Sequence, residues 1–541
     1  MLAGIFHWID INILALGREM RVSYLPPLMV YLAFGISGLT GIVGTFFVKD
    51  YLGISAAFLA ALGFWAVIPW TLKMPLGHLV DLIWRWKAWL VFLGAGLIAT
   101  GLLIMVGLLT DRAAMTAVMP AEAWYVLSVL LLPVGFMIQD VVADAMTVEA
   151  VPRVDEHGKP VPQETRKLMN TTMQTLGRVA LIGGLALVSG INLYFFQGAD
   201  KLAEAEKVAI YRQIYLTAMA IPFISVFGVA LAFFLKRRAV QRLVAQGMDS
   251  AQARKLLEEP DERPAPNWWI LGGSVAFVAI TLGLGFGNIP YNQEIIFTAS
   301  LAIIIFLMAK LTRELEPDAR ATLVGTAIVI FVFRAVPSVG DGLTWWMIDV
   351  LKFDQQFLAV LSLIAMVLTL FGMFLFRRFM AERSITYVVG FLTVLAAAFS
   401  LPVVGLYYDL HQWTAAATGG VVDARFIVVV NTALESPLGQ ISMIPMLAWI
   451  ANSAPRNLKA TYFAIMGSFV NLALSAGQLG TKYLNELFVI TREVKDAATG
   501  AIQVPADYSH LGYLLIAQLA LALSLPFAAI FIVRHTRLRS A

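Results

Sequence analysis

Long apolar stretches, separated by short polar ones, run along almost the entire chain. Fourteen of them are close to the roughly 20 residues that an α-helix needs to cross the hydrocarbon layer, and they form groups of six, two and six. They cover residues 25–48, 55–75, 88–109, 124–149, 168–196, 211–235, 268–286, 291–309, 322–347, 355–376, 384–406, 425–450, 459–484 and 511–533. The pattern predicts an all-α polytopic membrane protein with 14 transmembrane helices.

The grouping predicts two six-helix bundles with an extra helix pair between them. We expect the N-terminal bundle over residues 25–235, the extra pair over 268–310 and the C-terminal bundle over 322–533. Three polar segments remain, which we interpret as a cytoplasmic N-terminal segment, a basic cytoplasmic linker and a cytoplasmic tail: residues 1–24, 236–267 and 534–541.

The composition and the placement of charge agree with this division. Only 14% of the 541 residues are charged, against roughly 25% in soluble domains, and the mean hydropathy is +0.78. With the N-terminus in the cytoplasm, the loops and tails on that side contain 26 Lys and Arg residues, and those on the other side contain 7. The positive-inside rule then predicts an inner-membrane protein with both termini in the cytoplasm.

An internal repeat relates the two bundles. Residues 47–62 align without gaps to residues 346–361, and six positions are identical, among them the pair Asp50 and Asp349. Both segments connect the first and second spans of their bundles. Two parallel six-helix repeats resemble the architecture of the major facilitator superfamily, in which the substrate binds between the halves.

Two carboxylates interrupt the fourth apolar stretch, which reads VGFMIQDVVADAMTV over residues 134–148. Asp140 and Asp144 are four residues apart and therefore lie on one face of the helix, one turn apart. A carboxylate in the hydrocarbon layer costs about 2.5–3.5 kcal/mol on insertion scales, and such residues usually serve a function. We expect this face to line a cavity or the protein interior.

Three basic residues lie deep in other apolar stretches: Lys73, Arg178 and Arg334. Arg178 is in the fifth span at a depth comparable to Asp144 in the fourth, so we expect an ion pair between them. A purely structural pair is the alternative, although buried pairs stabilise proteins poorly because desolvation offsets the attraction.

The C-terminal bundle also contains acidic residues within its spans. Asp341 follows Arg334 by seven residues, two turns along the same face, and Glu435 lies in the middle of the tenth core span. Pro337 and Pro437 interrupt these two helices, which membrane proteins tolerate beside a cavity. We expect the ionisable groups of both bundles to meet in one wet central chamber.

The loop between the second and third spans reads GHLVDLIWRWK over residues 77–87. It fits the superfamily pattern of a glycine, an aspartate four residues on and basic residues beyond. We expect Gly77 to allow a tight turn or a close helix approach, and Asp81 to cap a helix or to pair with Arg85 or Lys87. Such a loop acts as a conformational latch; an ordinary basic loop is the alternative.

Several motifs resemble the folate-biopterin transporter family of the major facilitator superfamily. They are GLTGIVGTFFVKDYLGIS, IPWTLKMPLGHLVD, IQDVVADAMTVE, AVPSVGDGLTWWMIDVLKFDQQFL and KATYFAIMGSFVN. Two features depart from the family: the latch loop lacks the usual cluster of arginines, and the helix pair at 268–309 is additional. Muropeptide permeases and, more distantly, pigment-complex assembly proteins share part of this pattern.

The resemblance implies a secondary transporter of folates or pterins, driven by proton symport through alternating access. The flat pterin ring presents an amino-pyrimidinone edge, which Asp140 or Asp144 would accept; otherwise these acids carry the coupled proton. Arg334 or Arg178 would bind the glutamyl carboxylates of folate. Candidates for ring stacking, unless they form an interfacial aromatic belt, are Trp65, Trp70, Trp345 and Trp346.

Other classes of function find less support in the sequence. The chain contains no cysteine, its six histidines lie in predicted loops or tails, and it lacks GxxxxGK[ST], HExxH and GxSxG. We therefore expect no enzyme, cofactor, metal site or nucleic-acid partner, and a monomer that uses a small-molecule substrate and protons in a lipid bilayer. The alternatives are a permease for another amphipathic anion, such as a muropeptide, and a non-transporting assembly factor.

Overall fold

The computed structural model describes most of the chain. The described residues are 15–52, 54–84, 86–152, 154, 161–199, 202–258, 266–286, 289–314, 316–376, 383–438, 459–495, 502–536 and 538–540. Of the sequence predictions, those for residues 1–14, for Arg85 and for the last part of the tenth core span, 439–450, lie outside the described residues.

The N-terminal bundle consists of long helices, several of them built from consecutive segments. They are α2 (Ala15–Arg18), η2 (Val22–Tyr24), α3 (Leu25–Gly35), η3 (Ile36–Thr40), α4 (Gly41–Tyr51), α5 (Ala56–Val67), η4 (Ile68–Leu72), α6 (Lys73–Leu82), α7 (Ala88–Thr110), α8 (Arg112–Val118), α9 (Ala121–Ala150), α10 (Gln163–Phe195), α11 (Glu204–Ala218) and α12 (Ala220–Ala245).

The linker helix, the extra pair and the C-terminal bundle follow. They are α13 (Ser250–Glu258), α14 (Trp268–Phe286), α15 (Asn292–Leu311), η6 (Thr312–Glu314), α16 (Pro317–Arg334), α17 (Asp341–Asp349), α18 (Gln355–Leu375), α20 (Ile385–Tyr407), α21 (Leu410–Ala417), α22 (Ala424–Glu435), η7 (Ser436–Leu438), α24 (Lys459–Leu487), β1 (Val494–Lys495), β2 (Ile502–Val504) and α25 (Leu511–His535).

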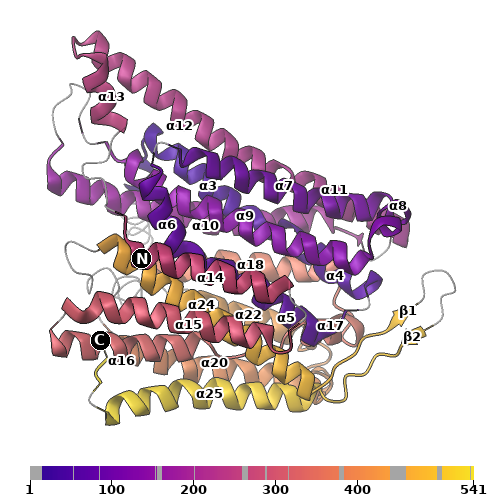
Figure 1. The fold of residues 1–541 in the computed structure, drawn as a ribbon. Helices are drawn as coiled ribbons and strands as arrows, with labels where there is room; N and C mark the ends of the chain where they lie inside the picture. Colours follow the sequence, from indigo (N-terminus) through magenta and orange to yellow (C-terminus); the bar gives the residue numbers. More distant parts are fainter. Residues whose placement is uncertain are drawn as a thin grey trace, which may run out of the picture.

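The helices run roughly parallel, so that the bundle has two ends (Figure 1). We call them the linker end, which carries α13 and the end of α25, and the hairpin end, which carries the antiparallel strands β1 and β2. In the described residues, ten helices are long and apolar enough to cross a membrane. The prediction of an all-α membrane protein is confirmed, whereas the number of 14 spans stays a prediction.

Side-chain caps and apolar composition explain where several helices begin. Ser55, Ser384 and Asp423 each accept a hydrogen bond from the backbone N–H three residues on, which satisfies a first-turn donor of α5, α20 and α22.

Helix α12 exposes large apolar side chains such as Phe223 and Phe227. Contiguous apolar surface of this kind is typical of helices that face lipid.

The two bundles contact each other on two sides. On one side α5, η4 and α6 pack against α24, and the Asn471 side chain donates a hydrogen bond to the Trp70 carbonyl oxygen at 3.2 Å. On the other side α10 packs against α18, and the Gln355 side chain donates to the Tyr211 hydroxyl at 3.0 Å.

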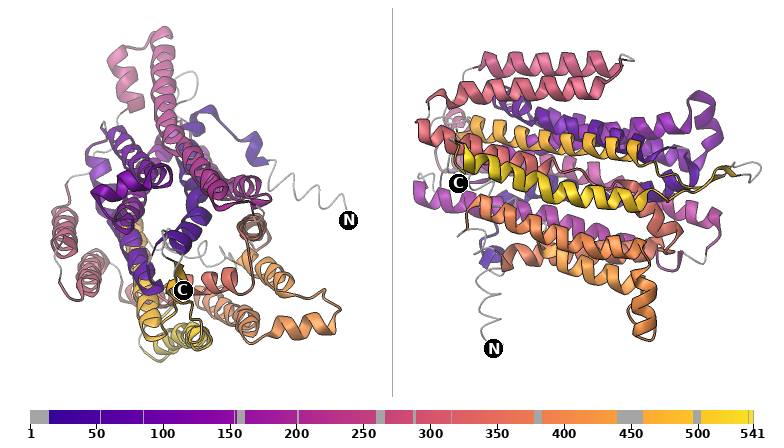
Figure 2. Two further views of the ribbon diagram at one scale, coloured as in Figure 1. Left: turned by 90° about the vertical axis from the view of Figure 1, so that its right-hand side faces the viewer. Right: turned by 90° about the horizontal axis from the view of Figure 1, so that it is seen from below.

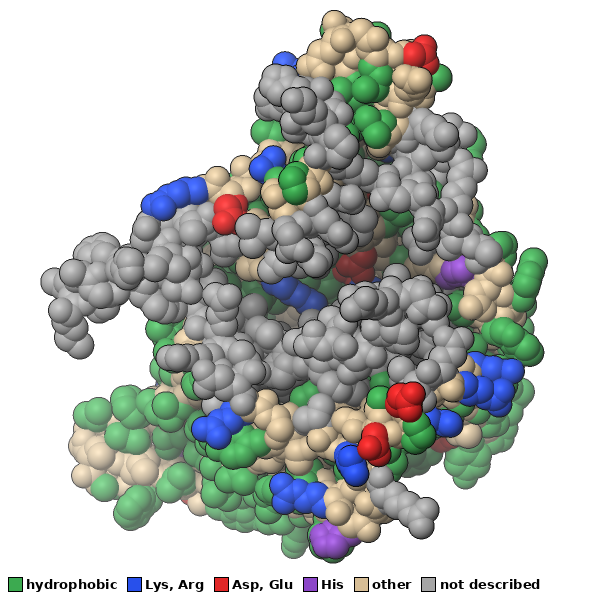
Figure 3. Space-filling view, turned by 90° about the vertical axis from the view of Figure 1, so that its left-hand side faces the viewer, with side chains coloured by type: hydrophobic (Ala, Val, Ile, Leu, Met, Phe, Trp, Pro, Cys, Tyr) green, Lys and Arg blue, Asp and Glu red, His purple; other side chains and the backbone are tan. Residues whose placement is uncertain are grey.

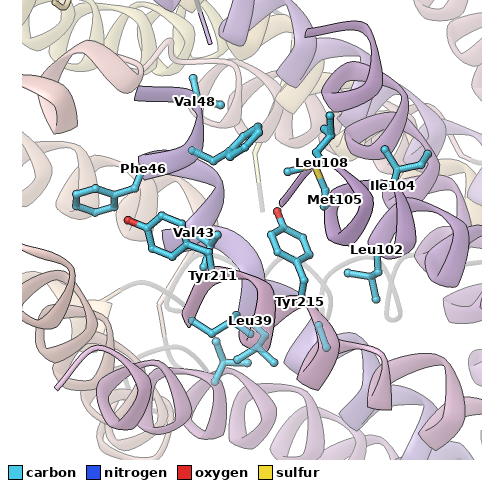
Figure 4. Packing of buried hydrophobic residues seen from close by; sticks show 14 of the residues in the cluster. Leu39, Val43, Phe46, Val48, Leu102, Ile104, Met105, Leu108, Tyr211 and Tyr215 are labelled. Carbon is cyan, nitrogen blue, oxygen red and sulfur yellow. The ribbon is translucent and has the colours of Figure 1, made fainter. Parts of the chain in front are cut away.

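The hairpin end is closed by apolar packing between the bundles. Trp345 and Ile348 of α17 belong to the same buried cluster as residues of α4, α7 and α11 in the N-terminal bundle. Figure 4 shows Val43, Met105 and Tyr215 reaching from these three helices into the cluster. The linker end, in contrast, is hollowed near its centre, and acidic and basic side chains are visible inside the hollow (Figure 3).

The first and seventh core spans are both interrupted, at positions that the repeat relates. The repeat offset of 299 residues places the 3₁₀ turn at 36–40 opposite 335–339, which lies between α16 and α17 (36 + 299 = 335). The predicted interruption of this span at Pro337 is confirmed. Pro337 lacks a backbone N–H, and Gly340 adopts a left-handed φ of 81° that glycine tolerates best, so the helix ends at Arg334 and restarts at Asp341.

The extra pair, α14 and α15, lies at the edge of the bundle (Figure 2). Near the hairpin end, the Gln293 side chain donates to the Ala61 carbonyl oxygen of α5 at 3.1 Å. The neighbouring residue, Glu294, accepts an ion pair from Lys482 at 3.1 Å and a hydrogen bond from Tyr483, both on α24. Two adjacent residues of α15 therefore connect the N-terminal bundle to the C-terminal bundle.

Two of the helix boundaries differ from the sequence prediction, and three elements were not predicted. Helix α12 continues to Ala245, ten residues beyond the predicted span, because its basic continuation is helical too. Helix α6 runs to Leu82, so part of the predicted latch loop is helix. The hairpin and the short helices α8 and α21 were not predicted, since none of them contains a long apolar stretch.

Candidate functional site

A cluster of charged residues joins the second span to the fourth. Lys73 Nζ lies 2.7 Å from Asp140 Oδ2 and 2.8 Å from Asp144 Oδ2. The Tyr31 hydroxyl donates to Asp144 Oδ1 at 2.6 Å. Asp140 is buried, with 9% of its side chain exposed, whereas Lys73 and Asp144 are 30% and 46% exposed. The cluster thus has one buried side and one accessible side.

The local fold explains why these groups meet. Lys73 is the first residue of α6, directly after the 3₁₀ turn η4, and this turn redirects the second span. Asp140 and Asp144 lie one turn apart on α9, as their spacing predicts, and Tyr31 comes from α3, which packs against α9. One ammonium faces two carboxylates, so the ionised cluster has a formal charge of −1.

The predicted partner of Asp144 is wrong. Among the residues that the structure describes, Lys73 and not Arg178 forms ion pairs with these carboxylates. Arg178 is on α10 and is exposed, although its neighbour Gly177 lies against the Tyr31 ring. Spacing along the chain placed Arg178 near the cluster, but the ion pairs of both carboxylates are with Lys73.

A cavity of about 210 Å³ lies between the bundles, closer to the hairpin end than the charged cluster. Asp341 and Trp345 of α17 contribute to its wall from the C-terminal bundle. The N-terminal bundle contributes Thr40, Gly41, Gly44, Thr45, Val48, Leu59, Tyr125, Ser128, Val129, Leu132 and Tyr215. The wall therefore combines one carboxylate, three large aromatic rings and several hydroxyls.

The break in the seventh span positions the carboxylate in this wall. Helix α17 begins at Asp341, directly after Gly340, and an acidic residue in the first turn is favoured by the helix dipole. Trp345 follows one turn later and is almost fully buried. Tyr125 comes from the first turns of α9 and Tyr215 from α11.

The cavity and the charged cluster share helix α9. Leu132 lines the cavity and Asp140 belongs to the cluster, eight residues further on, which corresponds to about 12 Å along a helix. Among the described residues, the ion pairs of the cluster lie within the N-terminal bundle, and the C-terminal bundle contributes one acid to the cavity. The expectation of one central chamber that collects the ionisable groups of both bundles stays a prediction.

The remaining C-terminal candidates lie outside both places. Arg334 ends α16, its side chain is half-buried, and the Gly477 position of α24 packs against its carbonyl group. Glu435 ends α22, is exposed and precedes the turn that contains Pro437. Because the helix breaks between Arg334 and Asp341, these two residues do not share a helix face as predicted.

The predicted latch loop is organised around a different acid. Lys87 Nζ lies 2.7 Å from Glu149 Oε1 at the end of α9 and stacks over the Trp84 ring at 3.6 Å. Lys236 of α12 approaches the same carboxylate at 3.5 Å. Glu149 therefore connects three helices at the linker end.

The expectation for Gly77 is wrong, because it lies inside α6 with open space where a Cβ atom would stand. Asp81 is in the same helix, but its side chain, like Arg85, is outside the described part.

Of the four tryptophans predicted to stack on a ring, Trp345 alone lines the cavity. Trp65 faces the extra pair, where its ring lies against the Gly285 position. Trp70 packs against Phe34, and Trp346 packs against Tyr407. Their positions are set by helix packing, to which spacing along the sequence gives no guide.

Sequence reasoning missed several residues that the structure brings to these sites. Tyr31 donates a hydrogen bond to the ion cluster, and Tyr125 and Tyr215 line the cavity. Glu149 forms an ion pair with Lys87 at the linker end. Tyrosines inside apolar spans and an acid at the end of the Asp140 helix were the available signals. In the part of the chain that is described, no group of three or more His, Asp or Glu residues is arranged to hold a metal ion.

The sequence is similar to a known protein family and to a curated transporter. Residues 292–538 match the model of the BT1 family. A protein from Synechocystis sp., described as a folate-biopterin transporter, is 22% identical over 479 residues, which cover 87% of this chain and 76% of that protein.

Solved structures of transporters share the fold. A POT family transporter in complex with 5-aminolevulinic acid superposes with a TM-score of 0.61 at 12% identity, covering 95% of each chain. The nucleoside transporter NupG gives 0.54 at 12% identity, covering 95% of this chain and all of that one. The two-bundle fold is thus shared with these transporters. The BT1 match over residues 292–538 and the Synechocystis relative support the resemblance of the motifs to the folate-biopterin transporter family.

Proposed function

We propose that the protein carries folate- or pterin-type molecules across the cytoplasmic membrane by proton symport, with alternating access between the two bundles. The family supports transport, and the substrate is proposed from the description of the Synechocystis relative. The excess of basic residues on one side supports cytoplasmic termini. The symmetric interruption of the first and seventh spans is typical of transporter helices beside a substrate path.

The observation that carries the proposal is the pair of carboxylates that share one lysine. With both acids ionised the cluster is negative, and one added proton makes it neutral. When the protein passes through a closed, dehydrated intermediate, the free energy needed to bury the cluster is lower for a neutral cluster than for a charged one. The half-exposed Asp144 offers the route by which a proton from solvent reaches the cluster.

The position of Lys73 links the cluster to the movement of the bundles. Helix α6 packs against α24 of the opposite bundle, and Asn471 holds the turn that precedes Lys73 through the Trp70 carbonyl. A change in the charge of the cluster therefore acts at the contact between the bundles. We expect protonation to favour the conformational change that carries the substrate.

Uptake into proteoliposomes tests the proposal. We expect an inward proton gradient to drive accumulation of labelled folate, dihydrofolate or biopterin by the unaltered protein. Asp140→Asn should abolish accumulation while leaving folded protein in the membrane. Asp318→Asn is the matched control, because Asp318 is an exposed acid whose ion-pair partner among the described residues is the exposed Arg539 at 3.5 Å.

Two results would contradict the proposal. Absence of gradient-driven uptake of all three compounds would favour a permease for another amphipathic anion or an assembly factor. Full accumulation by Asp140→Asn would remove the coupling role from the cluster.

A further inference from the structure

We infer that the cavity at Asp341 is the ring-binding pocket for the pterin head of the substrate, and that Asp341 accepts the hydrogen bonds of its amino-pyrimidinone edge. This inference rests on the proposed function and assigns the substrate contact to a residue of the C-terminal bundle. It also removes that contact from Asp140 and Asp144.

The first step is the state of the Asp341 carboxylate. In the described part of the chain, this side chain forms no ion pair and accepts no hydrogen bond, and it is exposed at the wall of the cavity. A carboxylate that opens into a cavity without a protein partner is available to a ligand that supplies N–H donors or a positive charge. Asp140 and Asp144 already have Lys73 and Tyr31 as partners.

The second step is the chemistry of the cavity wall. Two of its hydroxyls are already used, because Thr45 donates to the Gly41 carbonyl at 3.2 Å and Ser128 to the Gly101 carbonyl at 2.9 Å. Beside the carboxylate, the wall offers the aromatic rings of Tyr125, Tyr215 and Trp345, together with aliphatic side chains such as Leu59 and Leu132. A flat ring with two adjacent N–H donors satisfies both the aromatic walls and the carboxylate, which accepts such a pair in bidentate fashion.

The third step is size. The cavity volume of about 210 Å³ is smaller than the roughly 300–1,000 Å³ of pockets for drug-sized ligands. It accommodates a bicyclic ring and not an entire folate, whose aminobenzoyl-glutamate tail must extend out of the cavity. The pocket should therefore recognise the ring that folate and biopterin share, and should be nearly indifferent to the tail.

Inhibition of labelled folate uptake by three small competitors tests this inference on the unaltered protein. Pterin has the 2-amino group, lumazine has an oxo group in its place, and p-aminobenzoylglutamate represents the tail alone. We expect pterin to inhibit about 10- to 100-fold more strongly than lumazine, the range for one hydrogen bond to a charged group. The tail fragment should inhibit weakly or not at all.

Asp341→Asn then assigns the selectivity to one residue. An amide can rotate to present a donor to the lumazine oxo group, so the ratio of the two inhibition constants should fall to about 1 for this variant. Asp341→Glu, which retains the carboxylate, should preserve the preference for pterin even where uptake is slower. Asp318→Asn should leave the ratio at its original value.

The outcomes separate the two proposals. Folate uptake with an unchanged pterin-to-lumazine ratio in Asp341→Asn would overturn the pocket while leaving the transport function intact. Equal inhibition by pterin and lumazine on the unaltered protein would overturn it as well. Absence of any folate or pterin uptake by the unaltered protein would instead refute the proposed function.

Discussion

The acids of the two bundles are neutralised in different ways. In the N-terminal bundle, Asp140 and Asp144 share Lys73, and Tyr31 donates to one of them. In the C-terminal bundle, Asp341 borders a cavity and has no such partner among the described residues. A carboxylate paired within the protein is suited to exchanging its partner for a proton, whereas one without a partner is suited to a ligand.

The repeat makes this difference more informative. Both bundles interrupt their first span at related positions, so the backbone has kept its symmetry. The side chains have not: the offset of 299 places Gly372 opposite Lys73 (73 + 299 = 372). A Cβ atom at Gly372 would clash with the backbone of Pro437, so the position is used for close packing. One duplicated scaffold thus supports an ion cluster in one half and contributes an acid to a cavity wall from the other.

The largest loss of stability should come from Lys73→Met. The substitution leaves two carboxylates facing each other without a cation, and breaking a buried pair in this way costs about 3–5 kcal/mol. Because Lys73 is partly exposed, we expect the lower end of this range, measured as reduced thermal stability in detergent.

A second substitution checks the cause of this loss. Adding Asp140→Asn to Lys73→Met removes one of the two negative charges and should recover much of the stability. If the double variant is as unstable as Lys73→Met alone, packing of the lysine stem and not charge explains the effect.

The next effect concerns the contact that joins the two bundles through the extra pair. Glu294→Gln removes the ion pair with Lys482 and weakens the hydrogen bond from Tyr483. We expect a loss of about 1–3 kcal/mol, because a partly buried lysine loses its counter-charge. The double variant Glu294→Gln with Lys482→Met should be more stable than Glu294→Gln; equal or lower stability would contradict the ion pair.

A smaller loss of stability is expected for Tyr31, which belongs to the ion cluster with Lys73 and the two aspartates. Tyr31→Phe removes one hydrogen bond to Asp144, whose exposed side water can reach. We expect a loss of about 1 kcal/mol or less in stability, and gradient-driven uptake that persists, since both carboxylates and Lys73 remain. Loss of uptake as complete as in Asp140→Asn would show that the tyrosine itself carries the proton.

The smallest change in stability is expected for Tyr508, which lies outside the membrane spans in the loop after β2. Burial and the hydrogen bond from its hydroxyl to Asp349 Oδ2 raise the pKa of Tyr508 above its usual value near 10. The folded protein therefore holds this proton more tightly than the unfolded chain. The stabilisation is complete below about pH 10 and is lost as the pH rises further.

Thermal unfolding from pH 7 to pH 11 measures this contribution. Tyr508→Phe should lower stability slightly at neutral pH and should show a weaker alkaline decline than the unaltered protein. Parallel curves for the two proteins would contradict the raised pKa of Tyr508.

Hydropathy predicts most of the fold because every membrane span follows the same rule, a stretch of about 20 mostly apolar residues. The prediction of 268–286 coincides with α14, and 355–376 differs from α18 by one residue. The same rule is insensitive to breaks within a span, since residues 335–340 are as apolar as their neighbours. It also misses the hairpin, which lies outside the apolar stretches.

The site was predictable only where one helix determines it. The spacing of Asp140 and Asp144 gave their shared face, because both belong to α9. The choice of Lys73 over Arg178 depends on how α6 and α10 are rotated against α9, and a single sequence contains no direct signal for that. Tyr125 and Tyr215 meet Asp341 only through contacts among three helices.

Substrate counterflow in proteoliposomes without a proton gradient tests the division between coupling cluster and ligand pocket most directly. Counterflow requires substrate binding and the movement of the bundles, but no net proton transport. The account predicts that Asp140→Asn retains counterflow of labelled folate while losing gradient-driven accumulation. It predicts that Asp341→Asn weakens both, because each then requires a higher folate concentration. Loss of counterflow in Asp140→Asn together with normal counterflow in Asp341→Asn would contradict it.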